Sequence, residues 1–120
     1  MNKRNFIEKW LTNHTHCVIA TSYEDIPWAA TVNYTFDNKL NIYISSRPDS
    51  LKFQNILNNS TVCLVIDSQT REGTLQIQGI AKPLKPKSKD GPNLLVRPNF
   101  LTFLKREQSG KLTRISLKLK

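Results

Sequence analysis

Hydrophobic positions along the chain fall mostly into short runs, and several of these runs alternate with polar residues. Alternation with a period of two predicts β-strands that bury one face. One run, 61–67, is almost continuously apolar and predicts a central strand. In another run Gly79 predicts a bulge or a bend. The pattern predicts six strands: residues 16–23, 28–36, 40–46, 61–67, 74–82 and 111–119.

Three other segments carry apolar residues at helical spacing. The first helix is predicted over residues 3–13, with Asn2 or Asn5 as its cap. The second begins after Asp49 or Ser50 and runs to about residue 58. The third is predicted over 99–107, after Pro98. Its apolar positions are Phe100, Leu101, Phe103 and Leu104.

The segments between these elements are polar. Residues 24–27 and 37–39 are rich in turn formers, so the first three strands are expected to form an antiparallel meander. Residues 69–73 predict a polar loop, and 82–93 predict a basic loop. A chain of 120 residues is expected to form one domain, with the third helix and the terminal strand in residues 94–120. The predicted fold class is mainly β: a six-stranded antiparallel barrel with helices.

The apolar runs and the cysteines indicate in which cellular compartment the protein is expected. The chain has no stretch of about 18 apolar residues, so a membrane span is not expected. Its first residues lack the apolar run of a secretory signal, so we expect a cytoplasmic protein. Cys17 and Cys63 lie in strand-like apolar runs and are expected to be free, buried thiols. A disulfide is the alternative, and it would require an oxidising compartment.

The net charge of +9 is unevenly distributed. Residues 1–80 hold 7 Lys and Arg against 7 Asp and Glu, whereas residues 81–120 hold 11 against 2. Such a basic third can meet an anionic ligand, nucleic acid or only solvent. Because no nucleic-acid motif accompanies it, a solvated surface is the favoured interpretation.

The strongest candidate site follows the third predicted strand. Ser45 and Ser46 end that strand, and Ser50 and Lys52 begin the next helix. Hydroxyls, unpaired backbone amides and the positive end of a helix dipole together suit a phosphate monoester. The alternative is a serine N-cap followed by a solvated lysine. A lysine in the first helical turn opposes the dipole, which favours the binding interpretation.

Residues 17–81 resemble the pyridoxamine 5′-phosphate oxidase-like proteins, whose fold is the FMN-binding split barrel. The similarity lies in the order and content of successive pieces rather than in one invariant signature. These pieces are Ile-Ala-Thr at 19–21, Pro27, Asn-Tyr-Thr-Phe at 33–36, Ile-Tyr-Ile-Ser-Ser at 42–46, Ser-Leu-Lys at 50–52, Val-Cys-Leu-Val at 62–65 and Gln-Gly-Ile-Ala at 78–81. The chain is most similar to the small members of the family.

The resemblance implies a cofactor, a partner and a site. FMN is the implied cofactor, with another flavin, a deazaflavin or no cofactor as alternatives. The strand end and the Ser-x-Lys motif would hold the phosphate, and the main chain of Thr31, Val32 and Asn33 would bind the flavin ring. The protein would be a homodimer with the flavin in a shared groove, transferring electrons or hydride to an unidentified small molecule.

Three departures from the family pattern disfavour the oxidase reaction itself. Leu51 stands where family oxidases have arginine, the strand at 28–36 has no charge, and Thr74 takes the place of a glutamine. Arg47 or Arg97 could supply a missing positive charge. A non-catalytic barrel that uses its basic third for an anionic partner is therefore the alternative function.

The last candidates for a functional role are a pair of histidines and two aromatic residues. His14 and His16 form a His-x-His pair, which is too few ligands for a metal or haem site, so no metal is expected. Trp28 and Tyr34 could line a flavin or substrate pocket, but packing in the core or in a dimer interface is the favoured interpretation.

Overall fold

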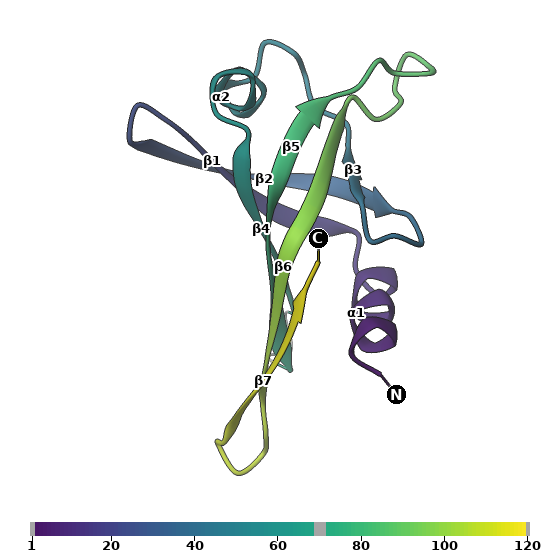
Figure 1. The fold of residues 1–120 in the computed structure, drawn as a ribbon, viewed down its shortest axis with the longest axis vertical. Coiled ribbons are helices and arrows are strands. Elements are labelled where there is room, and N and C mark those ends of the chain that lie inside the picture. Colours follow the sequence, from purple (N-terminus) through teal and green to yellow (C-terminus); the bar gives the residue numbers. More distant parts are fainter. Residues whose placement is uncertain (1, 69–71, 120) are drawn as a thin grey trace.

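The computed structural model describes residues 2–68 and 72–119. Within these ranges the chain forms two helices and seven strands (Figure 1). In chain order they are α1 (Lys3–Thr12), β1 (His16–Tyr23), β2 (Ile26–Phe36), β3 (Ile42–Ile44), α2 (Leu51–Asn58), β4 (Thr61–Asp67), β5 (Gly73–Pro83), β6 (Leu94–Arg106) and β7 (Leu112–Lys118). Of the loop predicted at 69–73, residues 69–71 lie outside the described ranges.

The strands form one antiparallel sheet in the order β3-β2-β1-β4-β5-β6-β7. A further pairing between β3 and the start of β6 closes the first six strands into a barrel. β7 pairs with the second half of β6 and lies outside the closed ring. The predicted mainly β barrel is confirmed, with seven strands in place of six.

The additional strand is β6, where a helix over 99–107 was wrongly predicted. The apolar residues at helical spacing also satisfy a period of two, because Leu101 and Phe103 point inward while Phe100 is exposed. β6 pairs with β5 along almost its whole length and with β7 over its second half. These two ladders satisfy the backbone of residues 99–106 as a strand, and tertiary pairing therefore overrides the local helical pattern.

Gly79 and Pro98 face one another at an irregularity in the β5–β6 ladder. The register shifts between Gln78 and Gly79, so the bulge predicted at Gly79 is confirmed. A Cβ atom at position 79 would lie 2.6 Å from the carbonyl oxygen of Arg97, a contact that only glycine avoids. Pro98 lacks an N–H donor and is tolerated in β6 because the ladder is already interrupted there.

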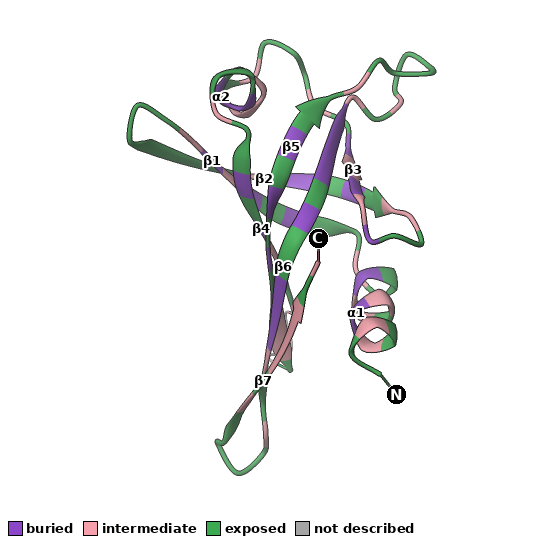
Figure 2. Cartoon of the chain, in the orientation of Figure 1, coloured by how far each residue is buried: buried purple, intermediate pink, exposed green. Residues whose placement is uncertain are grey.

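The core fills the barrel and the space beneath α1. Alternate strand residues are buried (Figure 2), and helix α1 adds Ile7 and Leu11 to the core. The ring of Phe103 packs edge-on against Phe6 and Trp10, with ring centroids 4.7 Å apart in both pairs. The indole N–H of Trp10 also donates to the Ile66 carbonyl at 3.0 Å. Asn2 is the α1 cap, as one of the two sequence alternatives proposed.

The two cysteines are both free. Cys17 is buried as predicted, and burial raises the pKa of its thiol to about 12. Cys63 is exposed, which corrects the sequence expectation. Its strand β4 turns Val62, Leu64 and Ile66 inward, so the residues between them face outward.

Candidate functional site

The barrel is split where β3 leaves β2. Their pairing covers only three residue pairs, from Phe36 opposite Ile42 to Tyr34 opposite Ile44. Leu40 lies in the left-handed region with φ 66°, which ends the turn before β3 and makes the strand shorter than the predicted 40–46. After Ile44 the chain turns away toward α2. The residues of β2 before Tyr34 therefore have no paired strand on that side within the described ranges.

The predicted residues Thr31, Val32 and Asn33 lie along this open side of β2. Thr31 and Asn33 are exposed, whereas Val32 is buried. The Tyr34 amide donates toward β1, to the Thr15 carbonyl at 3.1 Å. Because backbone groups alternate sides along a strand, the N–H and C=O groups of Thr31 and Asn33 point the other way, toward the split. Two of the three residues thus offer main-chain hydrogen bonds there.

Ser46 and Ser50 come together at the same point of the fold. Their Oγ atoms are 3.0 Å apart. Ser50 is the N-cap of α2: its Oγ accepts from the Phe53 amide at 3.3 Å and donates to the Arg47 carbonyl at 2.7 Å. The amides of Leu51 and Lys52 precede the first intrahelical donor and so remain available to solvent or a ligand.

The side chains of this first helical turn differ in exposure. Leu51 is 48% exposed, and Lys52 is half-buried. Arg47 pairs with Asp49 at 2.8 Å in an exposed ion pair, so part of its charge is already compensated. Arg97 lies on β6, and its charge acts on Tyr43, outside the cavity described below. Arg97 does not line that cavity, and its substitution for the family arginine stays a prediction.

Asn93 belongs to the site and was missed by sequence reasoning. Its Oδ1 accepts from the Ser46 amide at 2.9 Å, and its Nδ2 donates to the Ser46 carbonyl at 2.5 Å. This side chain thus takes the place of a strand partner just beyond the end of β3. The only local signal was an asparagine in a Gly-Pro-Asn turn sequence.

A cavity of about 420 Å³ lies between this strand end and the basic loop. Its lining includes Ser45, Ser46 and Arg47 on one side and Lys89 and Asn93 on the other. Ser45 Oγ donates to the Asp90 carbonyl at 3.3 Å across it. The structure therefore brings a lysine of the basic third to the predicted serines, 43 residues away in sequence.

The basic third does not form one patch. Residues 82–89 lie at one end of the strand β6, and residues 105–114 lie at the other (Figure 1). A strand of 13 residues separates its ends by roughly 40 Å. Since β6 replaces the predicted helix, most of the positive charge is divided between two distant groups, whereas Arg97 and Lys118 lie between them.

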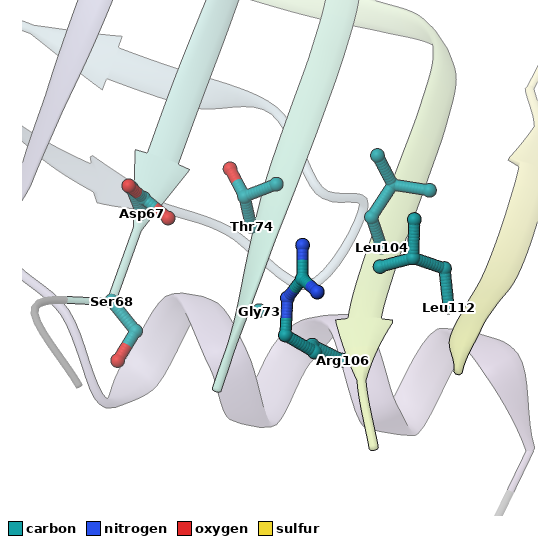
Figure 3. Close-up of a pocket in the computed structure, with 7 residues that line it drawn as sticks. All are labelled: Asp67, Ser68, Gly73, Thr74, Leu104, Arg106 and Leu112. Carbon is teal, nitrogen blue, oxygen red and sulfur yellow. The ribbon is translucent and has the colours of Figure 1, made fainter. Parts of the chain in front are cut away.

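Another cavity, of about 730 Å³, is larger than the serine cavity and is lined by residues of β5, β6 and β7 (Figure 3). Its lining includes Thr74, which takes the place of a family glutamine, together with Asp67 and Arg106. Thr74 and Pro83 are nine residues apart on β5, or roughly 30 Å, and Pro83 is at the end nearer β3. Thr74 therefore does not contact the serine cavity of its own chain.

The remaining sequence candidates have structural roles or lie apart. Tyr34 is buried, and its hydroxyl donates to the carbonyls of Leu11 and His14 at 2.7 and 3.0 Å. Trp28 is 47% exposed on the β1–β2 hairpin. His14 and His16 line one cavity of about 600 Å³ that Asp67 also lines. Among the residues that the structure describes, no three His, Cys, Asp or Glu side chains are placed to hold a metal.

A family model described as pyridoxamine 5′-phosphate oxidase matches residues 4–99. No curated protein matches the chain. In the described ranges, neither helix is long and apolar enough to cross a membrane.

Solved structures share the fold at low sequence identity. General stress protein 26 from Bacillus anthracis is similar with a TM-score of 0.75 and 16% identity, over 96% of this chain and 100% of that one. A pyridoxamine 5′-phosphate oxidase-related, FMN binding protein from Nostoc punctiforme has a TM-score of 0.73 and 10% identity, over 99% and 98%. A heme binding protein from Mycobacterium smegmatis has a TM-score of 0.75 and 11% identity, over 97% and 58%.

Proposed function

Because the chain belongs to the pyridoxamine 5′-phosphate oxidase family, we propose that it binds a flavin nucleotide, FMN, at the split between β2 and β3. The observation that carries this proposal is the open edge of β2 beside the serine end of β3. A flavin requires hydrogen bonds along its ring and an anion site for its phosphate. The split supports both within one stretch of surface.

The residues present fit the two ends of such a ligand. Thr31 and Asn33 would bind the ring through their main chain. Ser45, Ser46, Ser50 and Lys52 would hold the phosphate, with the amides of Leu51 and Lys52 available at the helix start. Val32 would pack beneath the ring from the core side. The FMN binding protein from Nostoc punctiforme, which shares the fold, supports the choice of ligand.

When bound, the flavin supplies the electron- or hydride-transfer chemistry, and this chain supplies binding and orientation. The substrate would be a small molecule. The missing arginine at Leu51 and the uncharged strand β2 argue against the oxidation of pyridoxamine phosphate. We therefore propose a flavin-dependent oxidoreductase of another specificity, in the cytoplasm, where both thiols would remain reduced.

Titration of the purified protein with FMN tests the proposal. Binding should change the flavin fluorescence, and Lys52→Ala should raise the dissociation constant by roughly fivefold because one partly screened cation is lost. Lys39→Ala is the matched control, since that lysine is exposed in the turn at the other end of β3. Its affinity should equal that of the wild type.

The alternative is a barrel without cofactor that binds an anionic partner. It predicts no fluorescence change with FMN, salt-sensitive binding to a polyanion such as single-stranded DNA, and no effect of Lys52→Ala. Division of the basic residues between the two ends of β6 makes a single polyanion site less favourable. A wild-type protein that leaves FMN fluorescence unchanged would refute flavin binding.

A further inference from the structure

The basic loop 84–93 is anchored at its base to the candidate site. The Leu84 amide donates to the Asn93 carbonyl at 2.7 Å, which closes the loop on itself. The Asn93 amide donates to the Ile44 carbonyl at 3.1 Å, and its side chain bonds both backbone groups of Ser46. The loop is therefore held against the end of β3 rather than extending freely from the barrel.

The tip of the loop is also fixed. The Gly91 amide donates to the Ser88 carbonyl at 3.1 Å and forms a turn with Lys89 and Asp90 at its centre. The hydroxyl of Ser45 donates to the Asp90 carbonyl at 3.3 Å and ties that turn to β3. Lys89 thus lines the cavity of about 420 Å³ that Ser45 and Ser46 also line.

Among the described residues, two basic side chains line this cavity, Arg47 and Lys89, and only Lys89 is available to bind an anion. Arg47 lines the cavity but is paired with Asp49, and Asp90 also lines it. Lys89 makes no salt bridge with any residue in the described ranges. Lys87, two residues earlier in the same loop, is exposed and does not line the cavity.

We infer that Lys89 binds the phosphate of the ligand, reaching it from the loop side of Ser45 and Ser46. It would supply the positive charge that is missing at the start of α2, where Leu51 stands in place of an arginine. This inference rests on the proposed function and adds a specificity-determining residue from a different element. It also assigns a role to the loop 84–93. Because Asn93 anchors the loop to the end of β3, Lys89 is held beside Ser45 and Ser46.

A comparison of FMN with riboflavin tests Lys89, because the two flavins differ only in the phosphate. Lys89→Gln should weaken FMN binding roughly tenfold and leave riboflavin binding unchanged, since one charge-assisted hydrogen bond to phosphate is lost. Lys87→Gln removes the same charge from the same loop and should change either affinity by less than about twofold. Lys89→Arg should restore most of the FMN preference.

Inorganic phosphate provides a second measurement that needs no flavin. Phosphate should raise the melting temperature of the wild type and of Lys87→Gln, but not of Lys89→Gln. If the wild type binds neither flavin yet shows this Lys89-dependent stabilisation, flavin binding is wrong and the phosphate site stands. If Lys89→Gln and Lys87→Gln behave alike in both measurements, Lys89 is not a phosphate ligand.

Discussion

Asp37 organises the turn that brings β3 back along β2. Its carboxylate accepts hydrogen bonds from the Lys39 and Asn41 amides, from the Asn41 side chain and from the Tyr43 hydroxyl, at 2.9 to 3.1 Å. Desolvation alone would raise the pKa of this carboxyl, but the hydrogen bonds from Asn41, Tyr43 and Lys39 outweigh it and lower the pKa. The hydrogen bond from the Tyr43 hydroxyl to Asp37 also raises the pKa of Tyr43.

Asp37→Ala should therefore destabilise the protein by about 1–3 kcal/mol at pH 7, measured by urea denaturation. Because the folded-state pKa is lowered, this stabilisation is complete above the ordinary carboxyl pKa of about 4 and is lost as pH falls through the folded-state value. The difference between wild type and variant should shrink as the pH falls below about 4. Asp49→Ala, at an exposed ion pair, should change stability by less than about 0.5 kcal/mol. A difference that does not vary with pH would contradict this role for Asp37.

At the scale of residues, the sequence identified site residues whose role depends on near neighbours in the chain. It missed those whose partners are far away in the sequence. Ser50 was identifiable because a serine before an apolar helical stripe is a cap signal that needs no knowledge of the fold. Asn93 was not, because its partner Ser46 is 47 residues away. Lys89 was one lysine among several in its loop, and only the anchoring of that loop distinguishes it.

At the scale of elements, β6 shows where local pattern stops being sufficient. All six predicted strands were placed within about two residues, because their apolar runs and alternation were clear: β1, β2, β3, β4, β5 and β7. In 99–107 the apolar spacing served a helix and a strand equally. Pairing with β5 and β7 decided between them, and neither pairing is visible in the segment itself. Topology depends on such contacts more than on propensity.

The bulge at Gly79 interrupts the β5–β6 ladder opposite Pro98, so β6 can continue past a residue that has no N–H donor. Gly79→Ala should destabilise the protein by about 2–3 kcal/mol, because the added Cβ would meet the backbone carbonyl of Arg97 at 2.6 Å and a backbone atom cannot move aside cheaply. Gly91→Ala is the control: its added Cβ would first meet the mobile Ser88 hydroxyl at 3.0 Å. Thermal denaturation of the two variants measures the contrast, and equal losses would argue against a tight bulge.

At the scale of the whole molecule, the outer face of the sheet is uncharged across its centre. One row of cross-strand neighbours is Ala29, Ala20, Cys63, Gln78 and Phe100, and the next is Thr31, Val18, Val65, Gln76 and Thr102. Val18 and Phe100 are 38% and 37% exposed there. A neutral face on a chain of net charge +9 suits contact with a second copy, because the repelling charges stay at the rim.

We therefore expect a homodimer that packs through this face and includes Thr31 in the groove between subunits. Val18→Lys should shift the protein to a monomer in analytical ultracentrifugation, because each contact would bury two unpaired lysines. Gln108→Lys adds the same charge in an exposed turn and should leave the dimer intact.

Cys63 provides an independent measure of the same contact. Cys17 should remain unlabelled in the native protein, because it is buried with a pKa of about 12. Labelling of Cys63 by a thiol reagent should be fast in Val18→Lys and in dilute wild type, and should slow as wild-type concentration rises and dimers cover the face. If the Cys63 rate is independent of concentration while ultracentrifugation still shows a dimer, the subunits meet elsewhere, and the flavin groove would have to be assigned to a different face.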